Sequence, residues 1–305
     1  MRENSIALSA MNSRVDARTP TARQWQADAL LVLVTFIWGS TFVLVKQAVA
    51  RFPVYYFLAL RFGLATLVLV TMFGRRLRSL SRQSIASGVL IGLFLFGGYA
   101  FQTFGLRLTT ASKAGFITGL SVVIVPLLSA PLLRRAPSGQ ALAGVALCTA
   151  GLALLSLGRD LKPSPGDLLV LGCAVCFALH IVSVSKFAPR TDALALTIVQ
   201  VATVALLSAA VALGSEAKPS LRPDTLAAGA FTGVLATALA FGVQNTVQTR
   251  TTATHTALIF ASEPAFAAVF GFFFGERLTR IGWLGCGLIL AGMLVAEVWP
   301  TGGRT

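Results

Sequence analysis

The sequence contains little charge, few acids and almost no histidine. Only 12% of its 305 residues are charged, and 55% are hydrophobic. Soluble domains carry about 25% charged residues, so an ordinary water-soluble domain is excluded. The membrane class remains, in which each spanning helix needs about 20 consecutive apolar residues. Runs of that kind recur along the whole chain.

Acids and histidines are too scarce for most catalytic sites. The 11 Asp and Glu and the two His form no acid pairs or His clusters along the chain, which excludes metal-dependent or prenyl-diphosphate chemistry. No P-loop is present, so ATP-driven transport within this chain is also excluded. Cys173 and Cys176 have the spacing of a metal or redox motif but lie in an apolar run without a second ligand pair, and we interpret them as packing residues. We therefore expect no metal and no cofactor.

The net charge of +14 indicates how the chain is oriented in the membrane and does not indicate nucleic-acid binding. The basic residues gather in short segments between apolar runs, without interleaved aromatics or a nucleic-acid motif, so we expect no nucleic-acid partner. If the N-terminus is cytoplasmic, most Lys and Arg of the first half lie inside, and only Arg51, Arg107 and Lys113 lie outside before the fifth helix. This bias predicts cytoplasmic N- and C-termini. The second half shows no such bias.

Ten apolar runs, separated by short polar or Gly- and Pro-marked breaks, predict ten membrane-spanning helices. A polar tail over 1–27 is expected to be disordered and cytoplasmic, and 299–305 forms a second cytoplasmic tail. The predicted spans are 28–49, 54–73, 84–107, 111–133, 139–157, 167–187, 192–213, 224–248, 253–274 and 279–298.

The five helices of 28–157 are repeated in 167–298. TTASKAGFI (109–117) matches TTATHTALI (251–259), and AGLALL (150–155) matches AGMLVA (291–296). DALLVLVTFIWGST (28–41) matches DLLVLGCAVCFALH (167–180) more weakly. An odd number of crossings places the second repeat in the opposite orientation. Such inverted repeats are typical of secondary transporters, whose site lies near the midplane between the repeats.

Several segments resemble the EamA-type family of the drug/metabolite transporter superfamily. They are WGSTFVLVKQAV (38–49), LRFGLATLVLV (60–70), SEP (262–264) and FGERLTRIGWLGCGLILAG (274–292). Within that family the chain is most similar to the YddG-like amino-acid exporters. The resemblance covers about 28–298 and implies ten helices around a central cavity lined by helices 1, 3, 4, 6, 8 and 9. It also implies export of small metabolites across the bacterial inner membrane.

The repeats align four helical faces that each carry an aromatic residue and, three residues later, a polar one. Side chains three apart share one face of a helix, and polar side chains in spans face protein or water rather than lipid. We therefore predict that these faces surround a substrate-binding cavity. An alternative is that the glutamines are interhelical hydrogen-bond partners and the rings are ordinary packing. The faces are Trp38 with Thr41, Phe177 with His180, Tyr99 with Gln102, and Phe241 with Gln244.

Glu263 is predicted to join this cavity. It lies close to mid-membrane, and Pro264 frees the carbonyl of Phe260 and bends the helix. Freed backbone groups at that depth need protein or a wet cavity beside them. The alternative is a purely structural Glu263, either paired with Arg61 or kept neutral by desolvation. Arg61 is itself expected to be architectural. Lys46 suits a gate or an interfacial anchor equally, and His255 lies near the cytoplasmic end of helix 9.

These features predict a secondary transporter that exports small metabolites by alternating access. Aromatic and amide groups with one acid suit amino acids, including aromatic ones, or flat organic cations bound by cation–π contact. An intramembrane enzyme is a distant alternative, because Gly119-Leu-Ser121 lacks the glycine that follows the serine of rhomboid-type proteases. Expected partners are the substrate and membrane lipid. Proton coupling stays open, and no feature assigns an oligomeric state.

Overall fold

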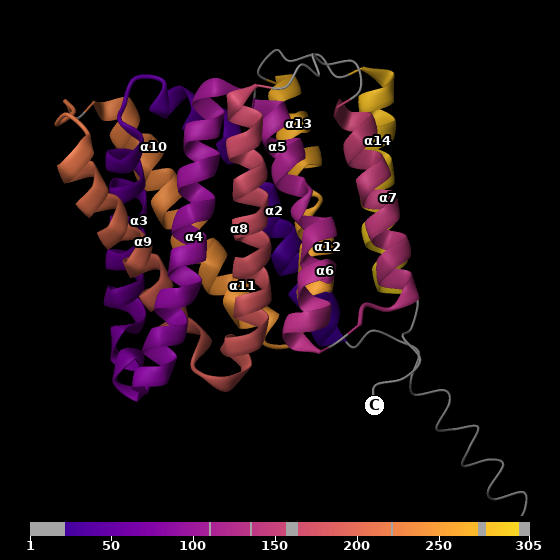
Figure 1. Cartoon of the computed structure of the whole chain (residues 1–305), viewed down its shortest axis with the longest axis horizontal. Helices are drawn as coiled ribbons and strands as arrows, with labels where there is room; N and C mark the ends of the chain where they lie inside the picture. Colours follow the sequence, from indigo (N-terminus) through magenta and orange to yellow (C-terminus); the bar gives the residue numbers. More distant parts are fainter. Residues whose placement is uncertain are drawn as a thin grey trace, which may run out of the picture.

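The fold is an all-helical bundle (Figure 1). The computed structural model describes residues 22–109, 111–134, 136–156, 164–220, 222–273 and 279–298. Across these ranges the helices form ten columns, where a column is one helix or two or more helical segments that follow each other end to end. None of the described residues forms a strand. The prediction of an all-α, ten-helix chain is confirmed in this part of the sequence.

The first half contains five columns, the fourth of which is interrupted. It comprises α2 (Ala22–Val49), α3 (Val54–Phe73) with a 3-10 turn η1 (Gly74–Ser79), α4 (Arg82–Leu108), α5 (Ala111–Gly119) followed by α6 (Ser121–Leu133), and α7 (Gly139–Ser156). Ser81 begins α4 by accepting a hydrogen bond from the backbone N–H of Ser84, as expected of a helix N-cap.

The second half repeats this order. It comprises α8 (Pro165–Phe187) with η2 (Ala188–Arg190), α9 (Ala193–Ser215), α10 (Pro223–Gly233) continued through the π-helical stretch η3 (Val234–Leu239) into α11 (Ala240–Gln248), α12 (Ala253–Phe260) followed by α13 (Glu263–Phe273), and α14 (Arg280–Val298). Ser164 and Asp167 form a capping box at the start of α8, with Pro165 in the first turn.

The helix boundaries correct several predictions. The first helix begins at Ala22, so 22–27 is helical rather than part of a disordered tail. The span 111–133 is interrupted at Leu120, and the span 253–274 is interrupted at Ala261 and Ser262. The tail 1–21, the tail 299–305 and the span ends at 157 and 274 lie outside the described residues.

Eight of the columns are long and apolar enough to cross a membrane. The other two described columns, α7 and α14, contain shorter apolar stretches at Gly139–Leu154 and Arg280–Val295. These two helices pack along each other at one side of the bundle (Figure 1). Gly151 allows the close approach, because a Cβ there would lie 2.6 Å from the carbonyl oxygen of Gly285.

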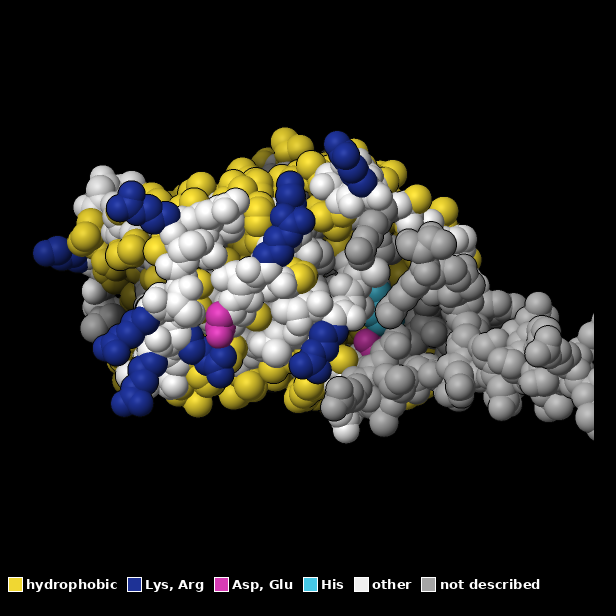
Figure 2. Space-filling view, turned by 90° about the horizontal axis from the view of Figure 1, so that it is seen from below, with side chains coloured by type: hydrophobic (Ala, Val, Ile, Leu, Met, Phe, Trp, Pro, Cys, Tyr) yellow, Lys and Arg dark blue, Asp and Glu magenta, His cyan; other side chains and the backbone are white. Residues whose placement is uncertain are grey.

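The two halves enter the bundle from opposite ends (Figure 1). Lys46, near the end of α2, donates a hydrogen bond to the carbonyl of Thr109, whose hydroxyl donates to Asp167 at the start of α8. The end of α2 and the start of α8 are therefore neighbours. The opposite end of the bundle carries many Lys and Arg side chains (Figure 2). The helix junctions at that end are α3–α4, α8–α9 and α11–α12, and their basic residues are Arg75, Arg76, Arg78, Arg82, Lys186, Arg190 and Arg250.

Candidate functional site

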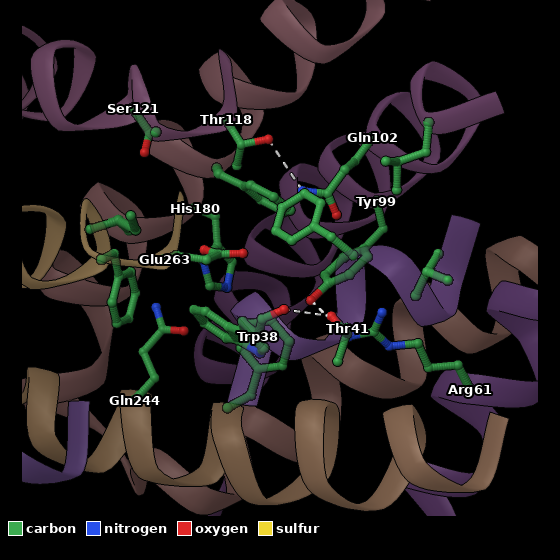
Figure 3. A pocket seen from close by; sticks show the side chains of 18 residues that line it. Trp38, Thr41, Arg61, Tyr99, Gln102, Thr118, Ser121, His180, Gln244 and Glu263 are labelled. Atoms are coloured by element: carbon green, nitrogen blue, oxygen red, sulfur yellow. Dashed lines mark hydrogen bonds between the residues drawn. The ribbon is translucent and has the colours of Figure 1, made fainter. Parts of the chain in front are cut away.

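A cavity lies in the middle of the bundle (Figure 3). The columns that line it are α2, α4, the α5–α6 pair, α8, α11 and the α12–α13 pair, with one further side chain, Arg61, from α3. Its volume is about 50 Å³, counted as space open to the centre of a water molecule. One water needs about 10–15 Å³ by that measure, so the cavity holds a few waters and must widen to admit a larger molecule.

The structure brings all nine sequence-predicted site residues to this one cavity. Both members of each aligned pair line it, together with Glu263. They are Trp38, Thr41, Tyr99, Gln102, Phe177, His180, Phe241, Gln244 and Glu263. The four faces predicted from the repeat therefore surround a common space, although a role in substrate binding remains a prediction.

The two broken helices position the acid. α13 begins at Glu263, and α6 begins at Ser121, which occupies the equivalent position of the first repeat. Both residues line the cavity. The breaks approach each other closely, because a Cβ on Gly119 would lie 3.0 Å from Cγ of Pro264. Pro264 fits the first turn of α13, where its missing N–H would have no intrahelical partner anyway.

The carboxylate of Glu263 has no ion-pair or hydrogen-bond partner among the described residues. Both Glu263 and Arg61 lie in the described part of the chain, and no ion pair within 4.0 Å joins them. No described side chain or backbone N–H donates a hydrogen bond to the Glu263 carboxylate. A Glu263–Arg61 ion pair is therefore not formed in this conformation, whereas the alternative of a structural Glu263 kept neutral by desolvation is not tested by these contacts. The N-terminus of α13 supplies partial positive charge that favours an anion at this position.

The guanidinium of Arg61 is held by hydrogen bonds on the side of the cavity away from Glu263. Its Nε donates to Oγ1 of Thr237 at 2.8 Å, and one Nη donates to the Tyr99 hydroxyl at 3.1 Å and to the carbonyl of Ala236 at 3.3 Å. The guanidinium also lies over the Tyr99 ring, 4.5 Å from its centroid. The remaining Nη1 donates to no described protein acceptor. Arg61 is only 3% exposed, so this donor faces the interior.

The π-helical stretch η3 provides the backbone acceptor for two of these side chains. Ala236 accepts from Arg61 and also from Nε1 of Trp38, at 2.8 Å. The hydroxyl of Thr237 donates five residues back to the carbonyl of Thr232 at 2.8 Å. Such π segments are rare and occur frequently at functional sites. The letters VLATAL carry no signal that would have predicted it.

The side chains of Gln102, Gln244 and His180 each bond to another polar side chain, and one amide oxygen has no partner. Gln102 donates to Oγ1 of Thr118 at 3.3 Å, and Gln244 donates to Oε1 of Gln248 at 3.1 Å. The Oε1 of Gln244 has no hydrogen-bond partner although it is enclosed. Nε2 of His180 lies 2.8 Å from Oε1 of Gln200. Gln102 thus bridges helices and lines the cavity at once, whereas Gln244 keeps a free acceptor.

Several lining residues were missed by the sequence reasoning, among them Arg61, Thr118, Ser121 and Phe260. Arg61 was expected to be architectural, yet it lines the cavity. Thr118 and Ser121 are the repeat equivalents of Phe260 and Glu263, and all four line it as well. Extending the alignment of 109–117 with 251–259 by four residues would have identified them.

Lys46 and His255 lie away from the cavity, at opposite ends of the bundle. Lys46 bonds to Thr109, and Nε2 of His255 lies 2.8 Å from Oδ1 of Asp28. The expectation that His255 lies near a helix end is therefore confirmed.

Comparison with known proteins identifies the family. The EamA-like transporter family matches residues 25–157 and again 164–297. The chain belongs to the EamA-like transporter family. It is a multi-pass integral membrane protein with two EamA repeats, a transporter and not an enzyme.

Several EamA relatives are similar over most of their length. An uncharacterized transporter of Archaeoglobus fulgidus is 30% identical over 98% of this chain and 94% of its own. The uncharacterized transporter YyaM of Bacillus subtilis is 25% identical over 88% of this chain and 92% of its own. A protein of known crystal structure superposes with a TM-score of 0.75 at 21% identity, covering 90% of this chain and 97% of its own, which shows a shared fold.

Proposed function

We propose that this EamA protein exports zwitterionic amino acids, including aromatic ones. The observation that carries the proposal is the separation of opposite charges across one cavity (Figure 3). Glu263 lies on one side with Gln244, and Arg61 lies on the other beside Tyr99. An α-amino acid carries a cation and an anion on neighbouring atoms and matches this arrangement at both ends.

The acid side of the cavity suits an ammonium group. The carboxylate of Glu263 accepts no hydrogen bond from the described protein, and Oε1 of Gln244 is an enclosed acceptor without a partner. Enclosed polar groups without partners are costly, and a charge-assisted hydrogen bond contributes about 1.5–3 kcal/mol. An ammonium donates up to three such bonds and satisfies both acceptors.

The arginine side suits a carboxylate. Arg61 is held rigidly by Thr237, Tyr99 and the Ala236 carbonyl, which leaves Nη1 as a preoriented donor. A fixed donor loses little conformational entropy when it binds an anion.

The rings between the charges suit an apolar side chain. Tyr99 contacts Phe177 and Phe241 edge-to-face, with centroids 5.3 and 6.2 Å apart, and Trp38 contacts Phe260 at 5.0 Å. This aromatic lining favours large apolar and aromatic side chains over small polar ones.

The transport mechanism proposed is alternating access between two inverted repeats. The opposed directions of α2 and α8 and the interrupted helices at the cavity support it, because broken helices at an inverted-repeat interface bind substrate in many transporters. The basic end of the bundle faces the cytoplasm of a bacterial inner membrane in this proposal.

Export of flat organic cations is the second candidate. It is favoured by Glu263 together with the aromatic rings, which attract cations through their faces. Arg61 weighs against it, because a buried guanidinium repels a cation that brings no anion of its own.

Substrate counterflow in proteoliposomes tests the proposal. Vesicles preloaded with phenylalanine are given labelled phenylalanine, phenethylamine (which lacks the carboxylate) or 3-phenylpropanoate (which lacks the ammonium). The proposal predicts that only phenylalanine is exchanged. Equal exchange of phenethylamine would instead favour export of organic cations. Repeating the assay as net uptake with and without a pH gradient determines whether protons are coupled.

A further inference from the structure

At each end of the bundle an acid–base contact joins the two repeats. At one end Nζ of Lys113 lies 3.5 Å from Oδ2 of Asp167, and at the other Nε2 of His255 lies 2.8 Å from Oδ1 of Asp28. We name these contacts the lysine pair and the histidine pair. All four side chains are largely buried, with exposed fractions of 15% and 17% in the lysine pair and 14% and 6% in the histidine pair.

The two pairs are formed by residues at equivalent positions of the two repeats. Asp28 and Asp167 are the first residues of the matched stretches 28–41 and 167–180, and Lys113 and His255 are the fifth residues of 109–117 and 251–259. Each pair therefore joins the first helix of one repeat to the fourth helix of the other. Because the repeats enter from opposite ends, one chemical arrangement appears once at each end.

The pairs stand on the helices that line the cavity, on either side of it. Asp28 precedes Trp38, and Asp167 precedes Phe177, by ten residues each, which corresponds to about 15 Å of helix. Lys113 and His255 precede Ser121 and Glu263 by eight residues, or about 12 Å. The cavity thus lies between the pairs, and each pair joins two of the cavity-lining columns at one end of the bundle.

The base of each pair lies on a short half-helix that ends at the cavity. Lys113 is on α5, which stops at Gly119, and His255 is on α12, which stops at Phe260. At the break after each half-helix the regular α-helical pattern gives way to tighter bonds, from the Leu120 N–H to the Ile117 carbonyl and from the Ser262 N–H to the Ile259 carbonyl. Such element-terminal positions can absorb backbone rotation, so each half-helix has a point about which it can turn. Movement of α5 or α12 separates its base from the aspartate of the other repeat.

Two further hydrogen bonds extend the lysine pair. Oγ1 of Thr109 donates to Oδ1 of Asp167 at 2.6 Å, and Nζ of Lys46 donates to the carbonyl of Thr109 at 2.8 Å. Lys46 thereby ties the end of α2 to the same contact. Both pairs are formed in this structure, and the cavity between them is small.

We propose that the lysine pair and the histidine pair are the two gates of the transport cycle, broken one at a time to open the cavity to opposite faces of the membrane. This inference rests on the alternating access proposed above. Removing one pair favours the conformation open at that end and leaves the other end closed. Nothing in the arrangement depends on which substrate the cavity holds.

Accessibility of a cavity cysteine tests the gates without a substrate. A cysteine-free chain carrying Ser121→Cys is labelled with a membrane-impermeant maleimide in right-side-out and in inside-out vesicles. Lys113→Met is expected to raise labelling about two- to tenfold from one face only, and His255→Leu by a similar factor from the other face only. If Lys113→Met does not fold, Asp167→Asn, which retains a hydrogen-bonding group in the capping box, takes its place.

Two other ion pairs provide matched controls. Arg76–Asp192 and Arg222–Asp224 also lie at helix ends but border α9 and α10 rather than the path to the cavity. Asp192→Asn and Asp224→Asn should leave labelling from both faces unchanged.

The result that overturns the proposal is equal labelling from both faces in either gate variant, no increase in either, or the same increase in a control. If the opposite-face pattern appears while no amino acid exchanges in counterflow, the gates stand and the substrate assignment fails. If phenylalanine exchanges and the pattern is absent, the gate proposal alone fails.

Discussion

Ser121 and Glu263 begin the second halves of two broken helices at the same position of the two repeats. The backbone arrangement is thus duplicated while the chemistry is not, since one repeat supplies a hydroxyl and the other a carboxylate. Two acids so close would repel each other and bind divalent or doubly cationic species. A single acid opposite Arg61 instead suits a molecule with one charge of each sign.

Topology is the first prediction. The Lys- and Arg-rich end of the bundle is expected to face the cytoplasm, because positive residues are retained on that side during insertion. Alkaline phosphatase fused after Thr305 should be inactive, and a fusion in the turn after Arg51 should be active. An active reporter after Thr305 would reverse the assigned orientation or change the number of crossings.

Close packing of α2 on α13 gives the second prediction. A Cβ on Gly39 would lie 2.7 Å from Cβ of Phe266 and 2.9 Å from the backbone nitrogen of Ala267. Gly39→Ala should therefore push the helices apart beside Glu263 and destabilise the protein by about 1–3 kcal/mol, measured as a lower melting temperature. Gly63 is the matched control, since no heavy atom lies within 4 Å of a Cβ built there. An equal loss in Gly63→Ala would contradict the packing argument.

The third prediction concerns the two glutamines of the cavity. Gln244→Leu removes an enclosed acceptor without a partner but also breaks the bond to Gln248, and Gln102→Leu breaks the bond to Thr118. Each variant should lower transport strongly and the melting temperature only modestly, because each loses a single side-chain hydrogen bond. Normal turnover of both variants, together with lost stability, would identify the glutamines as purely structural.

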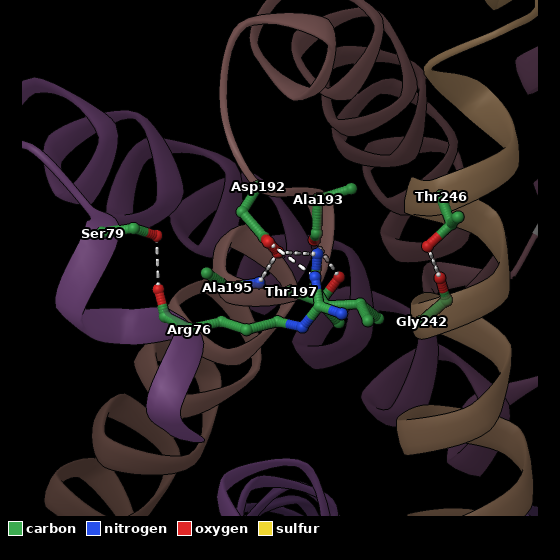
Figure 4. Close-up of polar contacts among 9 residues, drawn as sticks. Arg76, Ser79, Asp192, Ala193, Ala195, Thr197, Gly242 and Thr246 are labelled. Carbon is green, nitrogen blue, oxygen red and sulfur yellow. Dashed lines mark hydrogen bonds and ion pairs between the residues drawn. The ribbon is translucent and has the colours of Figure 1, made fainter. Parts of the chain in front are cut away.

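Asp192 provides a pH-dependent prediction at the basic end of the bundle (Figure 4). It lies in the turn before α9, outside the spans, and accepts hydrogen bonds from Leu194, Ala195 and Arg76. Burial alone would raise the pKa of Asp192, but the bonds from the Ala195 amide and Arg76 outweigh it and lower the pKa below its ordinary 3.8.

Because the folded-state pKa is lowered, the carboxylate stabilises the fold above pH about 4, and this contribution is lost as pH falls through the folded-state value. The melting-temperature difference between the parent and Asp192→Asn should therefore be constant near neutral pH and shrink in acid. Arg76→Ala should reduce the effect, and a difference that grows in acid would have the wrong sign.

Nine of the cavity-lining residues could be predicted from the sequence, because the two repeats could be aligned residue by residue. Aligning Trp38 with Phe177 and Tyr99 with Phe241 selected helical faces that all meet at the cavity, since symmetry-related faces must converge on the interface between the repeats. The fold class followed from composition and run length alone, because lipid permits few other arrangements.

The breaks and the π stretch depend on contacts between distant segments. α6 continues through Pro126 and Pro131, although each proline removes a helical hydrogen bond. The interruption lies instead at Leu120, next to the point where Gly119 meets Pro264. The sequence could not show what Arg61 contacts, because its partners Thr237 and the Ala236 carbonyl lie on η3, far away along the chain. No local pattern in the sequence predicts such a contact.

Counterflow of phenylalanine by Glu263→Gln tests the central claim most directly. The glutamine keeps the shape of the side chain and removes its charge, and equal substrate and proton concentrations on both sides separate binding from any proton coupling. Loss of the contact between Glu263 and the substrate ammonium should reduce affinity about tenfold or more. Counterflow at the parent's rate and affinity, with the cavity variant folded, would contradict the assignment of Glu263 as the ammonium site.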